Sequence, residues 1–340
     1  MSSTEVVCYI FGAVPLLVAP GCAWSLDEDA AAETDVDAPL RASCPIFADA
    51  GAILGATGRV RTLSLSDEVL VVADEIVTES GAVGNVAWTA ERSGDAASCA
   101  ADLIAGSELR SGLDATPLAG QHPAAFGAVF AAGARVHAFV FVLDGFERIG
   151  TGLATWDSAR RQFIAAPPYL FASGRPSYGD AALVEGGFVY AYGTASAGFL
   201  AEHCFVARAP VDRLFDPTAW QYYQDGNVFG TDPDEAWPIF GGGGGLGVVG
   251  RGGRILAIYA PPLGDVAVLR VGLGPTGPWS PATVVTRCQG PKKAFCTGFD
   301  WHPEWAGPSA ELPAFTYGLS SFEALPAAQR STRLVSAISP

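Results

Sequence analysis

Short apolar runs that end at glycine-rich turns recur along the chain, and the stretch 178–194 shows the unit in one piece. Small and apolar residues alternate up to the turn Glu185-Gly186-Gly187, after which residues 188–192 are rich in aromatic and β-branched side chains. This alternation predicts a β-hairpin. With a return strand at 202–209 and the closing Trp220, the unit is typical of one propeller blade.

The same order of strand, turn, strand and tryptophan recurs on both sides of this unit, at residues 126–156 and 246–279. Further units at 59–90 and 297–338 complete the series. Five units of about sixty residues, beginning after residue 41, predict an all-β, five-bladed β-propeller. A β-sandwich with recurring hairpins is the alternative, since even spacing alone fits both folds.

A run of five glycines, Gly241 to Gly245, precedes the fourth unit. Glycines next to a strand also occur in phosphate-binding loops, but no Gly-Lys-Ser or Gly-Lys-Thr and no helical pattern follows this run. We therefore expect a flexible lead into a strand rather than a nucleotide site. Residues 92–121 have little periodicity and predict an irregular connection.

The composition supports the all-β prediction and narrows the class of partner. Of the 340 residues 49% are hydrophobic, and 41 glycines and 24 prolines are expected where many short strands are joined by tight turns. The net charge is −15, and no cluster of Lys or Arg occurs. Nucleic-acid binding depends on such clusters, so we expect no nucleic acid as a partner.

The amino terminus carries signals of export. Residues 6–19 form an apolar run of signal-peptide length, too short to span a bilayer as a helix, and small residues before Cys22 are typical of a bacterial lipoprotein cleavage site. No Lys or Arg precedes Arg41, and Ala19 stands where Leu or Val is commoner. We interpret residues 1–22 as a lipoprotein-type signal peptide with Cys22 as the lipidated residue. Plain secretion, or a cytoplasmic protein with an unusual amino terminus, is the alternative.

Residues 23–40 contain six acids among alanines and predict a solvated, disordered tether ahead of a propeller domain at 41–340. We expect a monomeric protein of the cell envelope, at the outer membrane or the cell surface, that contacts the membrane through its lipid anchor only. A secreted protein is the alternative localisation.

Five cysteines remain after Cys8 and Cys22, and an oxidising compartment favours their pairing. Cys288 and Cys296 flank a short loop with Gly290-Pro291 and are the first choice for a disulfide. Cys44 with Cys99 is the second. Cys204 is left over, as a buried thiol in a strand.

Four motifs carry a resemblance to a known family: Gly179 to Thr194, Val206-Ala207-Arg208 with Asp216-Pro217-x-x-Trp220, Gly277-Pro278-Trp279-Ser280, and His302-Pro303-Glu304. They resemble the five-bladed β-propellers of the arabinanase and β-fructosidase (furanosidase) superfamily. Within it, the chain is most similar to a bacterial lipoprotein domain family of largely unknown function that includes some endo-arabinanases. The resemblance covers the chain from about Gly55 to its end and implies a polysaccharide or oligosaccharide as the partner.

Three acids are selected by their positions, because inner strands of a propeller start around one mouth of its channel. Asp180 starts an inner strand, Asp300 holds the matching place in the last unit, and Asp74 leaves the second strand of the first unit. The alternative for each is an acid that caps backbone N–H groups of a turn.

Glycoside hydrolysis needs two carboxyl groups, one of them an acid of raised pKa. The resemblance implies an Asp base, a second Asp that tunes the pKa, and a Glu acid. Asp74 is then the base, Asp180 the tuning acid or second carboxylate, and Glu304 the acid, with Glu202 and Asp300 as alternatives. No motif fixes the Glu, and Val-Ala-Asp-Glu stands where the family more often has Gly-Asp-Thr. A non-catalytic glycan-binding or surface scaffold protein is therefore the alternative function.

Two further sets of side chains complete the prediction. His302, beside a proline in a strand, is a candidate for holding a metal ion in the channel, although a lone histidine on an apolar strand is more often a hydrogen-bonded core residue. We expect no required cofactor. Trp237, Trp301 and Tyr178 are candidates for stacking on sugar rings, with packing between blades as the alternative.

Overall fold

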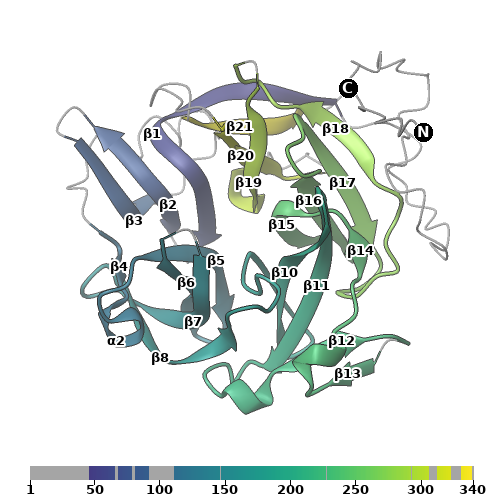
Figure 1. The fold of residues 1–340 in the computed structure, drawn as a ribbon. Coiled ribbons are helices and arrows are strands. Elements are labelled where there is room, and N and C mark those ends of the chain that lie inside the picture. Colours follow the sequence, from purple (N-terminus) through teal and green to yellow (C-terminus); the bar gives the residue numbers. More distant parts are fainter. Residues whose placement is uncertain are drawn as a thin grey trace, which may run out of the picture.

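The computed structural model describes residues 46–338, apart from residues 66–67, 79–80, 92–110, 146, 227, 292, 306–311 and 323–330. Antiparallel sheets surround a common centre as a five-bladed propeller (Figure 1). The fold predicted from the recurring hairpins is therefore confirmed, and the sandwich alternative is wrong. The predicted signal peptide with Cys22, the acidic tether, and the pair Cys44 and Cys99 lie outside the described residues.

One strand serves two blades and closes the ring. The second half of β1 (Ile46–Ser64) is the innermost strand of the first blade, followed outward by β2 (Glu68–Thr78) and β3 (Gly81–Glu91). Its first half pairs with the outermost strand of the last blade, which consists of β19 (Phe295–His302), β20 (Ala314–Ser320) and β21 (Ser331–Ile338). The two ends of the folded chain are thereby held in one sheet.

Each of the other three blades is a continuous stretch of chain. The second contains β5 (Ala124–Ala132), β6 (Arg135–Asp144), β7 (Glu147–Asp157) and β8 (Gln162–Ala172), with the short β4 (Leu113–Asp114) parallel to β8. The third contains β9 (Ala181–Glu185), β10 (Phe188–Gly198), β11 (Ala201–Pro210), β12 (Gln221–Gln224), β13 (Val228–Gly230) and, beside β11, β14 (Phe240–Gly241). The fourth contains β15 (Gly244–Arg251), β16 (Arg254–Ala260), β17 (Val266–Gly272) and β18 (Thr283–Arg287).

Paired glycines shape the hairpins that the sequence predicted. Gly186 and Gly187 between β9 and β10 have φ values of 58° and 82°, and Gly252 and Gly253 between β15 and β16 have 56° and 73°. A two-residue turn with both φ values positive matches the twist of the flanking strands, and glycine adopts it without steric cost.

Buried hydrophobic side chains form five clusters in the described part of the chain, one at each interface between neighbouring blades. At the interface between the second and third blades, Trp220 packs on Phe139 and Phe171, with ring centroids 6.0 and 4.9 Å apart. Trp279 packs on Phe240 between the third and fourth blades. The recurring tryptophans thus close one blade onto the preceding one, as large aromatic rings bury much apolar surface.

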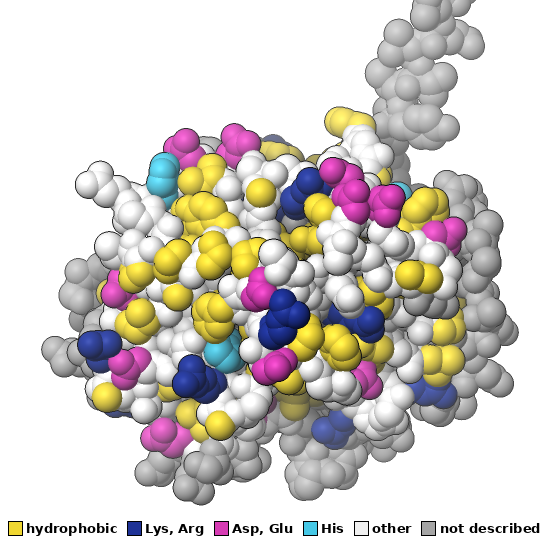
Figure 2. All heavy atoms as spheres, turned by 90° about the horizontal axis from the view of Figure 1, so that it is seen from below, with side chains coloured by type: hydrophobic (Ala, Val, Ile, Leu, Met, Phe, Trp, Pro, Cys, Tyr) yellow, Lys and Arg dark blue, Asp and Glu magenta, His cyan; other side chains and the backbone are white. Residues whose placement is uncertain are grey.

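Helical segments are short throughout the described residues. They are α2 (Thr116–Ala119) and the 3-10 turns η2 (Pro217–Ala219), η3 (Pro233–Glu235) and η4 (Pro303–Trp305), and no helix among them has the length and apolarity to cross a membrane. Figure 2 shows basic side chains scattered singly among acidic and hydrophobic ones on the face in view. This face offers no continuous basic surface to a phosphate backbone.

Candidate functional site

The innermost strands β1, β5, β9, β15 and β19 surround the axis, each in contact with the next. The three acids selected from the sequence lie on them or beside them. Asp180 directly precedes β9, Asp300 lies within β19, and Asp74 lies in β2 opposite an irregularity in the pairing of β1. Acids from the first, third and fifth blades therefore meet near one end of the channel.

Arg59, which the sequence analysis did not select, lies among these acids. Its guanidinium donates to both oxygens of Asp300, with Nε 2.8 Å from Oδ2 and Nη2 3.0 Å from Oδ1. Nη2 also lies 2.9, 3.3 and 3.1 Å from the backbone oxygens of Asp180, Leu246 and Phe299. Burial opposes the charge, but the Asp300, Asp180 and Asp74 carboxylates outweigh it and raise the pKa of Arg59. One side chain of the first blade thus binds the inner strands of the third, fourth and fifth.

Arg61, two positions after Arg59 in β1, is the second arginine bound to these acids. Its Nη1 donates to Oδ1 of Asp74 at 2.7 Å, and its Nη2 donates to the backbone oxygen of Phe126 in β5 at 2.8 Å. The backbone N–H of Arg59 donates to the other carboxylate oxygen of Asp74 at 2.8 Å. Both oxygens of Asp74 are thus hydrogen-bonded, and we call Arg59 and Arg61 together the arginine pair.

The Asp180 carboxylate is held differently, since it accepts a hydrogen bond from the hydroxyl of Ser177. Burial raises the pKa of Asp180, and the positive charge of Arg59 followed by the Ser177 hydrogen bond partly offsets this rise. Burial likewise raises the pKa of Asp300, against the opposing effect of Arg59. Burial therefore favours the neutral form of both carboxyl groups, and the charge of Arg59 opposes it in each case.

Glycines allow the strands to approach this closely. A Cβ on Gly298, whose φ is 60°, would lie 2.3 Å from Cγ of Arg59, and a Cβ on Gly245, whose φ is 64°, would lie 2.1 Å from the backbone N of Gly298. The five-glycine run leads into β15, as expected. At Gly245 the contact with the fifth blade leaves no room for a side chain.

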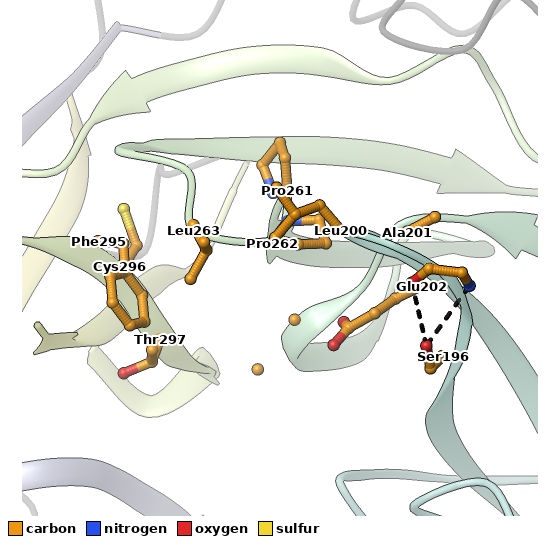
Figure 3. A pocket seen from close by; sticks show the side chains of 13 residues that line it. Ser196, Leu200, Ala201, Glu202, Pro261, Pro262, Leu263, Phe295, Cys296 and Thr297 are labelled. Carbon is orange, nitrogen blue, oxygen red and sulfur yellow. Dashed lines mark hydrogen bonds between the residues drawn. The ribbon is translucent and has the colours of Figure 1, made fainter. Parts of the chain in front are cut away.

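A pocket of about 350 Å³ opens beside the axis, between the third, fourth and fifth blades. Figure 3 shows Glu202, at the start of β11, pointing its carboxylate into this pocket, with Leu263 and Thr297 across from it. Its Oε2 is buried and accepts no hydrogen bond from the described residues. Burial and then the charge of Asp180 raise the pKa of Glu202. Among the acids considered from the sequence, Glu202 is the one that lines the pocket.

The disulfide Cys288–Cys296 forms part of the pocket wall, and its pairing was predicted. Cys296 lines the pocket, and the backbone N–H groups of Cys288 and Cys296 donate to the oxygens of Asp265 and Gly264. The disulfide is thereby tied to the loop that carries Leu263. Cys204 is a buried free thiol, also as predicted.

His302 is the last residue of β19, two positions after Asp300, and Glu304 follows it in η4. Neither residue lines the pocket. His302 is fully buried, with Nδ1 2.6 Å from the hydroxyl of Thr62 and Nε2 2.8 Å from that of Thr316. The described residues contain no group of three or more His, Cys, Asp or Glu side chains that could hold a metal ion. The geometry favours the core role of His302.

The three aromatic candidates differ in how far their side chains are exposed to solvent. Tyr178 is 0% exposed and packs on Phe171, and Trp301 is 6% exposed and packs edge-on against Phe315. Both rings belong to the cores between blades, the alternative considered for them. Trp237 is 53% exposed and can meet a ligand, but it does not line the pocket.

The sequence contained one signal for the arginine pair. Arg59 and Arg61 flank the buried Val60, and both side chains reach backbone oxygens of other blades. Two arginines next to a buried position of an innermost strand indicate buried partners of opposite charge.

No family model matches the chain, and no curated protein matches it. Solved structures do. A protein from Bacteroides ovatus ATCC 8483 superposes with a TM-score of 0.61 at 14% identity, over 83% of this chain and 86% of that one.

Two of the similar structures hold sugars. The GH43_1 enzyme from Xanthomonas citri complexed with xylotriose has a TM-score of 0.53 at 12% identity, covering 84% of this chain and 89% of its own. The α-L-arabinofuranosidase PaAbf62A from Podospora anserina in complex with cellotriose has a TM-score of 0.53 at 11% identity, covering 87% and 98%. At these identities the likeness shows the fold: a five-bladed propeller with structural neighbours among glycoside hydrolases.

Proposed function

We propose that this chain is a carbohydrate-active propeller that binds an oligosaccharide at the Glu202 pocket and does not cleave it. The observation that carries the proposal is the arginine pair, whose guanidinium groups occupy the axis and bind the carboxylates of Asp74 and Asp300. The similarity to propellers that hold xylotriose and cellotriose supports carbohydrate as the class of ligand.

Cleavage needs a carboxylate that is free to act as base or nucleophile beside the acid. Asp74 was the base predicted from the resemblance, but Arg61 and the backbone N–H of Arg59 occupy its two oxygens. Asp300 has Arg59 on both oxygens. A carboxylate whose two oxygens are already hydrogen-bonded has no oxygen free to activate a water or to attack the sugar.

Binding of a panel of arabinan, xylan, fructan and glucosamine oligosaccharides, followed by analysis of the products, tests the proposal. We expect one class to bind and to be recovered uncut, and Glu202→Gln to weaken its binding by about tenfold. Glu185→Gln is the matched control, since it removes an exposed carboxylate at the other end of the third blade. Absence of binding across the panel would refute the proposal.

Hydrolysis is the second candidate, and the position of Glu202 in the pocket under the influence of Asp180 favours it. Burial raises the pKa of Glu202 and the neighbouring Asp180 raises it further, as is required of an acid that protonates a leaving oxygen at neutral pH. Product release that Glu202→Gln and Asp180→Asn each abolish would establish this candidate in place of binding alone.

We also propose that the protein is exported and anchored by lipid at Cys22, as the small residues before this cysteine and the acidic stretch after it indicate. A Cys22→Ser chain is expected to move from the membrane fraction to the soluble fraction. If it stays with the membrane, lipid at Cys22 is not the anchor.

A further inference from the structure

The wall of the Glu202 pocket combines a single carboxylate with neutral side chains. Glu202 is the one charged residue among the described residues that line it, and the other side chains are apolar or carry a neutral hydroxyl. Leu263 and Phe295 belong to the apolar part, Ser196 and Thr297 to the polar part. Glu202 is half-buried against these walls, so its charge is only partly solvated and is stabilised by a partner that compensates it.

Inside the described part of the chain, Glu202 has no such partner. Its Oε2 is buried without a hydrogen-bond donor, and the site of a Cβ on Gly244 lies only 3.5 Å from this oxygen. The arginine pair is engaged by Asp300, Asp74 and backbone oxygens. The charge that acts on Glu202 is that of Asp180, which is negative as well.

These features favour a positively charged ligand group over a neutral one, and a neutral group over a negatively charged one. A ligand ammonium group would bring N–H donors to Oε2 and a positive charge beside Glu202, where the negative charge of Asp180 also acts. Both effects are strengthened where water is partly excluded. A neutral hydroxyl would bring one donor only. A ligand carboxylate would be repelled by Glu202.

We propose that the pocket takes an amino sugar with a free, protonated amine, which binds the carboxylate of Glu202 while a face of the sugar ring packs against Leu263 and its apolar neighbours. This inference rests on the proposed glycan binding and names the class of glycan. The pocket volume of about 350 Å³ is within the range of small-ligand sites, roughly 300–1,000 Å³.

Calorimetric titration of the purified protein with three probes tests the inference. The probes are a glucosamine trimer, its N-acetylated form, and cyclohexylamine as an amine without a sugar, all at about pH 6, below the ordinary pKa of an amine. We expect the glucosamine trimer to bind at least about tenfold more tightly than the N-acetylated trimer. Glu202→Gln removes this preference, and Glu185→Gln retains it.

A second variant keeps the test independent of the stability of Glu202→Gln. Thr297 lines the pocket across from Glu202 (Figure 3), so Thr297→Lys supplies an ammonium group from the protein itself. We expect this variant to lose the preference for the glucosamine trimer, because its own lysine would occupy the carboxylate.

The remaining outcomes separate this inference from the proposed function. Equal affinity for the two trimers, unchanged by Glu202→Gln, overturns the amino-sugar inference and leaves glycan binding intact. Binding of cyclohexylamine alone identifies a cation site that is not for sugars and overturns the amino-sugar inference, while the oligosaccharide panel decides the proposed function. Binding of none of the three probes overturns the inference, and the wider oligosaccharide panel then decides the proposed function.

Discussion

Arg59 and Asp300 lie 241 positions apart in the sequence and form a two-point ion pair at the centre of the propeller, with contacts of 2.8 and 3.0 Å. Arg59 is on the first innermost strand of the ring and Asp300 on the last. The pair therefore joins the two ends of the ring at the axis, as β1 joins them at the rim through its pairing with β21.

Removal of the guanidinium should destabilise the whole ring. We expect Arg59→Met to lower the free energy of unfolding by about 3–5 kcal/mol, because it leaves a poorly solvated Asp300 without its partner. Arg160→Met, which breaks an exposed ion pair with Asp157, should cost no more than about 1 kcal/mol. Denaturant unfolding measures both. Equal effects of the two substitutions would mean that the axial pair contributes no more than a surface pair.

Gly298 should not tolerate a side chain beside Arg59. Gly298 and Gly133 both have a φ of 60°, but an added Cβ meets Arg59 at 2.3 Å in the first case and nothing within 4 Å in the second. Because the backbone strain of the two alanine substitutions is the same, their difference reports the contact. We expect Gly298→Ala to destabilise by about 1–3 kcal/mol more than Gly133→Ala in thermal or denaturant unfolding. A smaller loss at Gly298 than at Gly133 would contradict the packing described.

His302 should make the protein sensitive to acid. Burial lowers its pKa from 6.5 to about 3, so below pH 6.5 the unfolded chain binds a proton that the folded chain does not take up. The stability from the neutral, buried His302 is therefore complete above pH 6.5 and is lost as the pH falls toward about 3. We expect His302→Gln to show a flatter fall of stability across this window. Parallel pH profiles of the two proteins would assign the acid sensitivity to the carboxylates instead.

The disulfide should matter to both the fold and the pocket. Cys288 and Cys296 are eight positions apart, and their replacement by serine should cost about 2–4 kcal/mol, the usual range for a native disulfide. Since Cys296 lines the pocket, the same replacement should weaken oligosaccharide binding. Cys204→Ser, which alters a buried thiol outside the pocket wall, is the control for loss of a cysteine. Unchanged binding by the double serine variant would show that the wall holds its shape without the crosslink.

Local patterns predicted the strands and turns well, because a hairpin is specified by neighbouring residues. The turn at Gly186 and Gly187 and the pair Cys288–Cys296 each depend on a few residues close in sequence. The assignment of Tyr178 and Trp301 to the pocket or the core depends on which side of a strand faces the next blade, and that is set by the packing of distant sheets.

The arrangement of the acids could not be predicted in the same way. Asp74, Asp180 and Asp300 were placed near one mouth from their positions in the repeat, and the structure brings them around Arg59. Their hydrogen-bond partners could not be predicted, since the side chain of Arg59 binds residues 121 to 241 positions away in the sequence. The influence of Asp180 on Glu202 depends likewise on how the β10–β11 hairpin, with its irregular pairing between Ser196 and Gly198, lies relative to β9, which no motif encodes.

The location of a bound sugar tests the account most directly. Crystals of the protein soaked with the tightest-binding oligosaccharide of the panel should show an intact sugar against Leu263, with a donor group within hydrogen-bonding distance of Glu202. Density for the sugar at another surface, such as the exposed Trp237, with the Glu202 pocket unchanged, would contradict the account.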